Sequence, residues 1–436
     1  MNGSMSPPRA FVLRRGFERL RESAMVKQSL LVFTASMVVN VCGFVAHAIA
    51  SRQLGVAGYG ELYALINAAL IASLPVAFVA PVVAQLAAEF RALRDDGHLR
   101  GLTDGIAGTF GKLGIFYLAV ATLGALPFAH FLHVPVWSVP FVGLLAGVTL
   151  YVNALRAIAQ GTQDFIGYGF SNAAEGIAKV IGISLLIAVG LHLAGGVVGF
   201  VLGPASALAY LGMRLKRRYA ASEPHSVQYD WHRILNAGAG AAAATIAIAL
   251  MGSADVVLVK HFFAPHEAGL YAAASLGGKM LLYLVGFVPT VLLPQAADRH
   301  ARGARTREVL AGSMTMLAVV AFCGLSVFYF FGTQVLHALV GHAFDAAEPL
   351  LVKYGLAMVL LALTNSLTFY GIATHRLAFT VPLFVCTLGT LCAIIMIHPS
   401  LNTVVEIMVL GNLAAAIAVT TALIFQRRTN GRRSTV

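Results

Sequence analysis

Residues 62–91, LYALINAALIASLPVAFVAPVVAQLAAEFR, return in altered form at residues 270–299, LYAAASLGGKMLLYLVGFVPTVLLPQAADR. Aligned without gaps at an offset of 208, the stretches share eight identities: Leu62/Leu270, Tyr63/Tyr271, Ala64/Ala272, Leu74/Leu282, Pro81/Pro289, Val83/Val291, Ala88/Ala296 and Arg91/Arg299. Apolar composition produces a few such matches by chance, but it does not account for the Tyr, Pro and Arg pairs. A second alignment, at an offset of 212, pairs Asn153/Asn365, Leu155/Leu367 and Thr162/Thr374. We infer an internal repeat.

The composition indicates where this repeat lies. Of the 436 residues, 58% are hydrophobic and 11% are charged, whereas a soluble domain has about 25% charged residues. Soluble globular, disordered and collagen-like proteins are therefore excluded. A membrane-spanning helix needs roughly 20 apolar residues. The apolar stretches predict twelve such helices, at 28–50, 62–88, 107–131, 138–160, 170–191, 194–214, 235–259, 270–293, 309–333, 349–372, 377–397 and 402–425.

The basic residues predict the orientation of these spans. The chain has 30 Lys and Arg and a net charge of +12. With a cytoplasmic N-terminus, 25 of the 30 fall on inner segments, and only Arg52 and Lys260 fall on outer ones. Positive charges collect in cytoplasmic loops, so this asymmetry supports an even number of spans with both termini cytoplasmic. Orientation accounts for most of the net charge, and no nucleic-acid partner is predicted.

The polar stretch 215–233 predicts how the chain divides. It is the longest break in hydropathy after the N-terminus, and six predicted spans lie on either side of it. The repeat offset covers an even number of spans, so the halves have the same orientation. We therefore predict an all-α integral membrane protein with two parallel six-helix lobes. Its segments are a basic amphipathic cytoplasmic segment (1–27), an N-terminal lobe (28–214), a cytoplasmic linker (215–233), a C-terminal lobe (234–425) and a basic cytoplasmic tail (426–436).

Ionisable and amide side chains inside the spans are the candidate functional residues, because they are costly in a bilayer unless they face a wet interior. Glu175 and Lys179 share one helical face with Asn172, and can pair at i, i+4. That pair serves either a transport path or only its own neutralisation. Arg156 shares a face with Asn153. It either faces the path or extends to the interface.

Five further positions stand out in or directly after the first, seventh and eighth spans. The offset of 208 aligns His47 with Asp255 and Arg52 with Lys260, so each lobe's first helix ends with an ionisable residue followed by a cation. Lys279 lies deep in its span without a partner in its own helix, which predicts that it faces a cavity.

No residue pattern predicts catalysis or a metal site. The four cysteines lie in apolar runs without CxxC spacing, and the histidines are scattered. Nucleotide-binding, zinc-protease and catalytic-triad motifs are absent from the sequence. We therefore predict a protein that is not an enzyme, with no cofactor and no metal.

Short motifs resemble one known family. The stretch 51–60, SRQLGVAGYG, resembles the R-x-L-G-x-x-x-Y-G signature after the first helix of Wzx-type polysaccharide flippases. These are O-antigen and exopolysaccharide transporters of the multidrug/oligosaccharidyl-lipid/polysaccharide exporter superfamily. Residues 254–271 resemble the family's D…G-x-Y segment, 160–165 resemble its Q-G-x-x-x-F turn, and Pro294 matches its helix-8 proline. One departure is Lys260-His261 where the first lobe has Arg52-Gln53.

The resemblance implies a central cavity between the lobes that opens alternately to either side. The implied cargo is an undecaprenyl-diphosphate-linked oligosaccharide, flipped across a bacterial inner membrane for O-antigen or exopolysaccharide assembly. Membrane lipids, a coupling proton or sodium ion, and the polymerase and chain-length proteins of the same pathway are the expected partners.

A diphosphate is a dense anion, so cations in a cavity of low dielectric constant attract it. We therefore assign the head-group path to Arg52, Arg156, Lys179 and Lys279. Ion coupling is assigned to His47, Glu175 and Asp255, and sugar contacts to Asn40, Asn153 and Asn365. The nearest alternative is a multidrug or cation antiporter of the same superfamily. A membrane-embedded glycan polymerase is disfavoured because the longest predicted outer segment, about 334–348, is too short for a domain.

Overall fold

The computed structural model describes residues 9–226, 231–286, 307–374 and 376–433, and within these ranges every regular element is a helix. The first half contains α1 (Arg9–Ala72), α2 (Val76–Ala92), α3 (Asp96–Leu123), α4 (Ala125–Leu132), η1 (Val136–Ser138), α5 (Val139–Gly161), α6 (Phe165–Leu186), η2 (Ile187–Leu191) and α7 (His192–Arg218). The second half contains α8 (Trp231–Met251), α9 (Ala254–Phe262), α10 (Pro265–Val285), α12 (Arg307–Leu339), η3 (His342–Ala347), α13 (Glu348–Ala373), α14 (Thr380–Met396) and α15 (Leu401–Arg433).

The predicted fold class, an all-α membrane protein, is confirmed. In the described part of the chain, nine helical runs are long and apolar enough to cross a membrane, and α14 is a shorter apolar helix. One of the nine runs, Phe165–Arg218, holds two predicted spans. The predicted span 62–88 is divided between the end of α1 and α2, so the helices are consistent with twelve spans. The last part of predicted span 270–293 lies outside the described residues.

The first two predicted spans are separated at a single residue. The sequence predicts a break between spans 28–50 and 62–88, and α1 consists of two helices that meet at a non-helical residue, Gly55. Gly55 has φ +68° and ψ −178°, a backbone conformation that glycine adopts without steric cost. The chain therefore turns from the first span into the second at this one non-helical residue, without a longer loop.

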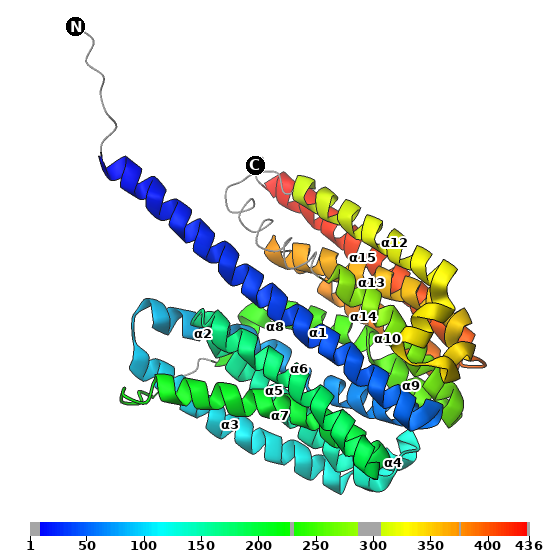
Figure 1. Ribbon diagram of the computed structural model, residues 1–436. Coiled ribbons are helices and arrows are strands. Elements are labelled where there is room, and N and C mark those ends of the chain that lie inside the picture. Colours follow the sequence, from blue (N-terminus) through cyan, green and yellow to red (C-terminus); the bar gives the residue numbers. More distant parts are fainter. Residues whose placement is uncertain (1–8, 227–230, 287–306, 375, 434–436) are drawn as a thin grey trace.

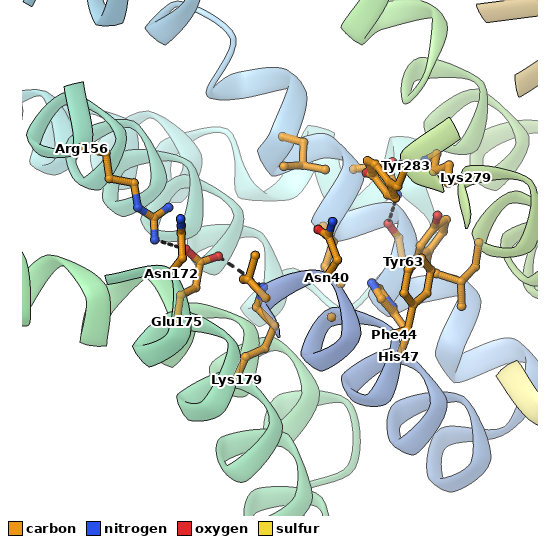
Figure 2. A pocket seen from close by; sticks show the side chains of 16 residues that line it. Asn40, Phe44, His47, Tyr63, Arg156, Asn172, Glu175, Lys179, Lys279 and Tyr283 are labelled. Carbon is orange, nitrogen blue, oxygen red and sulfur yellow. Dashed lines mark hydrogen bonds and ion pairs between the residues drawn. The ribbon is translucent and has the colours of Figure 1, made fainter. Parts of the chain in front are cut away.

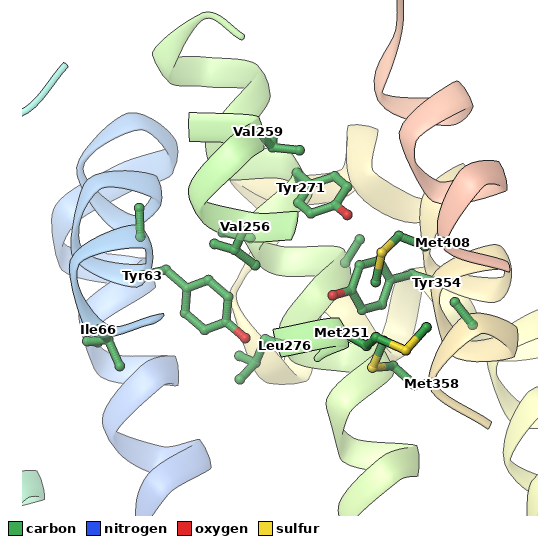
Figure 3. Packing of buried hydrophobic residues seen from close by; sticks show 14 of the residues in the cluster. Tyr63, Ile66, Met251, Val256, Val259, Tyr271, Leu276, Tyr354, Met358 and Met408 are labelled. Atoms are coloured by element: carbon green, nitrogen blue, oxygen red, sulfur yellow. The ribbon is translucent and has the colours of Figure 1, made fainter. Parts of the chain in front are cut away.

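The two halves lie beside each other and are joined by α1. Figure 1 shows α2 to α7 in one group and α12 to α15 in another, with α1 running along both. A shared apolar core connects them: Tyr63 of α1 packs in one cluster with Tyr271 of α10 and Tyr354 of α13 (Figure 3). We call the end of the bundle that holds Gly55 and Gly341 the outer end, following the prediction from the charges, and the opposite end the inner end.

The outward faces of several helices are apolar, as expected for contact with lipid. Only 11% of the most apolar window of α3 and 17% of that of α12 are buried within the protein. Large side chains such as Leu123 and Phe322 are 87% and 74% exposed. Such surfaces are unfavourable in water, which supports a multi-pass membrane protein.

A buried carboxylate fixes the inner ends of α5, α6 and α7. Asp164 caps α6 by accepting from the Gly167 backbone N–H at 3.0 Å. Arg214 donates from Nε and Nη2 at 2.7 and 2.9 Å, and Arg218 lies 3.3 Å away. Burial raises the pKa of Asp164, but the bonds from Arg214 and Gly167 outweigh it and hold the pKa below its ordinary value.

Asp164 is therefore expected to make stability pH-dependent. A carboxyl with a lowered folded-state pKa contributes stability above its unfolded pKa, about 3.9, and that contribution disappears as pH falls through the folded pKa. Asp164→Asn keeps a cap but loses the charge. At neutral pH it is expected to lower stability by about 1.5–3 kcal/mol, the range for hydrogen bonds to charged groups. Thermal unfolding in detergent checks this, and the difference between the two proteins must shrink below about pH 4.

Candidate functional site

A cavity of about 310 Å³ lies between the halves. It is lined by residues of α1, α5, α6 and α10, and so by helices of both halves. Its polar lining residues are Asn40, His47, Tyr63, Asn67, Arg156, Asn172, Glu175, Lys179, Lys279 and Tyr283 (Figure 2). The lining contains three cations, Arg156, Lys179 and Lys279, and one carboxylate, Glu175. With His47 counted as neutral, its net charge is +2.

One side of the cavity is a charged network on α5 and α6. Arg156 donates to Glu175 Oε2 at 2.8 Å and to Ser171 Oγ at 3.1 Å. Lys179 Nζ lies 3.4 Å from Glu175 Oε1 and 5.5 Å from the centroid of the Phe200 ring. These three charged side chains are 11–17% exposed. The helical spacing brings Glu175 and Lys179 together as predicted, and Arg156 adds a second cation to the same carboxylate.

The other side of the cavity presents Lys279 of α10. Its Nζ donates to Asn67 Oδ1 at 2.9 Å and lies 5.1 Å from the centroid of the Tyr63 ring. Lys279 is 6% exposed, and within the described residues it forms no ion pair with a carboxylate. Its positive charge is stabilised by an amide oxygen and an aromatic face, which leaves it free to attract an anion in the cavity.

His47 and Asn40 lie on α1 between these two sides (Figure 2). The Nδ1 atom of His47 is 3.2 Å from the Tyr59 hydroxyl, and its ring centroid lies 5.4 Å from that of Tyr63 and 5.0 Å from that of Phe200. The imidazole is therefore held by aromatic neighbours at the wall of the cavity.

Asp255 lies outside this cavity but is connected to it. It is fully buried, and its Oδ2 accepts from the Tyr271 hydroxyl at 2.8 Å and the Tyr354 hydroxyl at 2.6 Å. Ser275 Oγ donates to Tyr354 Oη at 3.0 Å and lies 3.4 Å from Tyr63 Oη. Since Tyr63 lines the cavity, a chain of hydroxyl groups leads from the buried carboxylate to the cavity wall.

Arg52 also lies outside the cavity, at the outer end. Its guanidinium donates to the carbonyls of His337 and Ala338, both at 2.8 Å, in the last turn of α12. A cation at the carbonyl end of a helix is electrostatically favourable. Arg52 therefore joins α1 to the second half.

Other contacts close the outer end between the halves. His261 contacts the Phe131 carbonyl at 2.6 Å, and Lys260 Nζ lies 3.9 Å from Glu61. Gly60 of α1 packs directly on Gly269 of α10, where an added Cβ on Gly60 would lie 2.8 Å from the Gly269 nitrogen. Direct contacts thus join the two halves at the outer end.

The structure gathers six of the ten predicted site residues around one cavity. Four lie elsewhere: Arg52 at the outer end, Asp255 in its tyrosine cluster, and the asparagines Asn153 and Asn365 away from the lining. The sequence did not predict that Asn67, Tyr63 and Tyr283 line the cavity. Of these three, only Tyr63 carried a signal, its identity with Tyr271 in the repeat alignment. The residues at the cavity are Asn40, His47, Arg156, Glu175, Lys179 and Lys279.

A second cavity, of about 430 Å³, lies on the opposite face of the same part of α1. It is lined almost entirely by aliphatic and aromatic residues, including Ala68, Ile71, Tyr117, Phe128 and Val142. Ile66 and Leu70 of the intervening turns face the polar cavity. A short segment of α1 thus separates a cationic space from an apolar one.

The architecture is shared with solved membrane transporters. A multidrug resistance MATE family transporter of the MOP superfamily, solved in an inward-facing conformation, superposes with a TM-score of 0.72 at 10% identity, over 93% of this chain and 99% of the other. The lipid II flippase MurJ, in an inward closed conformation, gives 0.65 at 14% identity, over 91% and 87%.

A MOP superfamily transporter from Pyrococcus furiosus, described as having a binding pocket of reverse polarity, gives a TM-score of 0.56 at 14% identity, over 92% and 95% of the chains. No family model matches the sequence, and no curated protein matches it. The protein therefore has the fold of MOP-superfamily transporters. These neighbours are transporters and flippases rather than enzymes, in agreement with the prediction.

Proposed function

We propose that this protein flips an undecaprenyl-diphosphate-linked oligosaccharide across the bacterial inner membrane by alternating access, for O-antigen or exopolysaccharide assembly. The observation that carries the proposal is the cavity with Arg156 and Lys179 on one half and Lys279 on the other. A diphosphate placed there contacts cations of both halves, and its charge is attracted more strongly than in bulk water.

The remaining features fit an amphiphilic cargo. The apolar cavity behind α1 suits a hydrocarbon chain, while Asn40 offers hydrogen bonds to sugar in the polar cavity. Asn153, Asn365 and Arg52 do not line the cavity in this conformation. We propose that the two asparagines contact sugar, and Arg52 the head group, only in conformations in which the halves are arranged differently. The MurJ neighbour is, by its description, a lipid II flippase, so the same fold handles a lipid-linked cargo.

We propose ion coupling by a proton or sodium ion through His47, Glu175 and Asp255. His47 lies on the cavity wall, and Asp255 is linked to that wall through Tyr354, Ser275 and Tyr63. One oxygen of Asp255, Oδ1, has no hydrogen-bond partner within the described residues, which leaves it able to take a proton or ion. Bacterial inner-membrane location and cytoplasmic termini belong to the same proposal.

A binding comparison tests the proposed cargo. Purified protein in detergent is incubated with undecaprenyl diphosphate, undecaprenyl monophosphate, undecaprenol and the cation ethidium, and bound ligand is measured by native mass spectrometry. We expect the diphosphate to bind most tightly and the uncharged alcohol least, because the cavity is cationic. Equal binding of all three lipids would contradict a diphosphate site.

A multidrug or cation antiporter is the second candidate. It is favoured by the MATE neighbour and by Glu175, a carboxylate able to bind a cationic drug. It is disfavoured because Arg156 and Lys179 already neutralise Glu175. Ethidium binding that exceeds diphosphate binding would support this second function and reject the first.

A further inference from the structure

At the inner end, three metal-ligating side chains from two distant segments converge on one point. Asp95 and His98 lie at the start of α3, and His225 lies in the linker after α7. Their ligand atoms all lie within 4.8 Å of one another. His98 Nδ1 is 2.7 Å from Asp95 Oδ2 and 3.4 Å from His225 Nδ1, and His225 Nδ1 is 3.6 Å from Asp95 Oδ1.

These separations suit a small divalent transition-metal ion. Zinc binds histidine nitrogen and carboxylate oxygen at about 2.0–2.2 Å in tetrahedral geometry, which places neighbouring ligand atoms about 3.3 Å apart. Without an ion, two ring nitrogens and a carboxylate share one small space, and at least one nitrogen has to carry a proton. A divalent cation is attracted by all three groups at once. Two imidazoles and one carboxylate also suit zinc better than magnesium or calcium, which prefer oxygen ligands only.

The surrounding structure holds the ligands in place. Asp95 is the N-cap of α3 and accepts from the His98 backbone N–H at 2.9 Å. The His98 ring stacks on Phe90 with centroids 5.0 Å apart. Supported ligands of this kind are typical of metal sites, where neighbouring groups orient each ligand.

The linker is docked against α3 by backbone contacts as well. The His225 N–H donates to the Gly97 carbonyl at 3.1 Å, and Arg100 donates to the carbonyls of Ala220 and Ser222 at 2.9 and 2.5 Å. A Cβ on Gly101 would lie 1.9 Å from the His225 carbonyl oxygen, so glycine permits this approach. The position of His225 is therefore set by the fold of the linker.

We propose that Asp95, His98 and His225 form a zinc-class metal site that fastens the linker between the halves to α3. A bound ion connects the linker to the first half only six positions before α8 begins at Trp231. It therefore limits how far the second half can move away from α3. The sequence predicted no metal site, because its ligands are 127 residues apart in the chain.

Zinc binding is tested on full-length protein without a histidine tag. The described residues contain one other cluster of this composition, His337, His342 and Asp345 at the outer end. The reference protein is therefore the His337→Ala/His342→Ala variant, which removes the second cluster. Titration with ZnCl₂, with MgCl₂ as a control, is expected to give one zinc ion per chain and no magnesium binding. Absence of zinc binding in this reference protein would overturn the proposal.

Two variants in that reference protein assign the site. His225→Gln and His98→Gln are each expected to weaken zinc binding about tenfold or more, in the range known for disturbed metal sites. His225 is 55% exposed in its side chain, so its replacement leaves the core intact. His130→Gln, at the outer end, is the control and retains full affinity. Unchanged affinity in both the His225 and His98 variants would place the zinc elsewhere and reject the site.

Limited proteolysis tests the effect on the linker. Trypsin cleaves after Lys and Arg, and Lys216, Arg217 and Arg218 form the last turn of α7, directly before the linker. Zinc is expected to slow cleavage there severalfold in the reference protein and not in the His225→Gln variant, and EDTA is expected to reverse the protection. Cleavage that is equally fast with zinc and with EDTA would reject the fastening of the linker.

Discussion

Replacing Lys279 with glutamate is expected to abolish binding of undecaprenyl diphosphate. One charge contact at 4 Å contributes about 4 kcal/mol at an effective dielectric constant of 20, and charge reversal turns this attraction into repulsion. We therefore expect affinity to fall by at least about 100-fold, which corresponds to about 2.8 kcal/mol. The Lys279→Gln variant removes the charge without adding the opposite one, so its affinity falls less. Native mass spectrometry and flipping in proteoliposomes measure both effects.

The control for this prediction is Lys353→Glu. Lys353 lies at the outer end of α13, is 43% exposed, and bonds to Asn402 and Glu406 rather than to the cavity. The same change in net charge there is expected to leave binding unchanged. Lys279→Gln must also keep a thermal unfolding temperature close to the parent, since glutamine can still donate to Asn67. A folded Lys279→Glu protein with parental diphosphate affinity would remove Lys279 from the site.

The internal repeat is the part of the sequence that predicted similar local structure in the two halves. The offset of 208 pairs His47 with Asp255 and Tyr63 with Tyr271, and the structure gives both pairs related surroundings. His47 packs against the Tyr63 ring, and Asp255 accepts from the Tyr271 hydroxyl. Repeated segments fold alike because the same apolar spacing and the same small residues meet the same bilayer.

Contacts between the halves follow another rule and could not be predicted from the repeat. Tyr63 contacts Ser275 and Asn67 contacts Lys279, both at a separation of 212 residues rather than 208. The halves therefore meet one helical turn away from equivalent positions. The sequence identified Lys279 as lacking a partner within its own helix, but its partner lies on α1 of the other half.

Arg52 shows a second limit of sequence reasoning. A cation beside a family-like motif was assigned to the head-group path, whereas the structure places it on the carbonyls at the end of α12. Those carbonyl groups belong to the backbone, so no residue pattern marks them as its partner. The same holds for Asp95, His98 and His225, which only the docking of the linker brings together.

The second large effect is expected from Gly269→Ala at the outer end. A Cβ on Gly269 would lie 2.0 Å from the Val56 carbonyl oxygen and 2.6 Å from its carbonyl carbon. Both are backbone atoms, so no side-chain rotation relieves the clash, and α1 and α10 have to separate. Overpacking of this kind costs about 1–3 kcal/mol. About 1.4 kcal/mol changes the ratio of two populations tenfold. We therefore expect the conformation with a closed outer end to be no longer the most populated one.

Distance measurement between the halves detects this opening. Spin labels at His133 and His266, both exposed at the outer end of opposite halves, are introduced as cysteines after the four native cysteines are replaced. Gly269→Ala is expected to shift the distance distribution to longer values and to slow flipping, because return to the closed state becomes limiting. Gly389→Ala is the matched control, since a Cβ there meets nothing within 4 Å. An unchanged distribution in a folded Gly269→Ala protein would mean that the α1–α10 contact does not close the outer end.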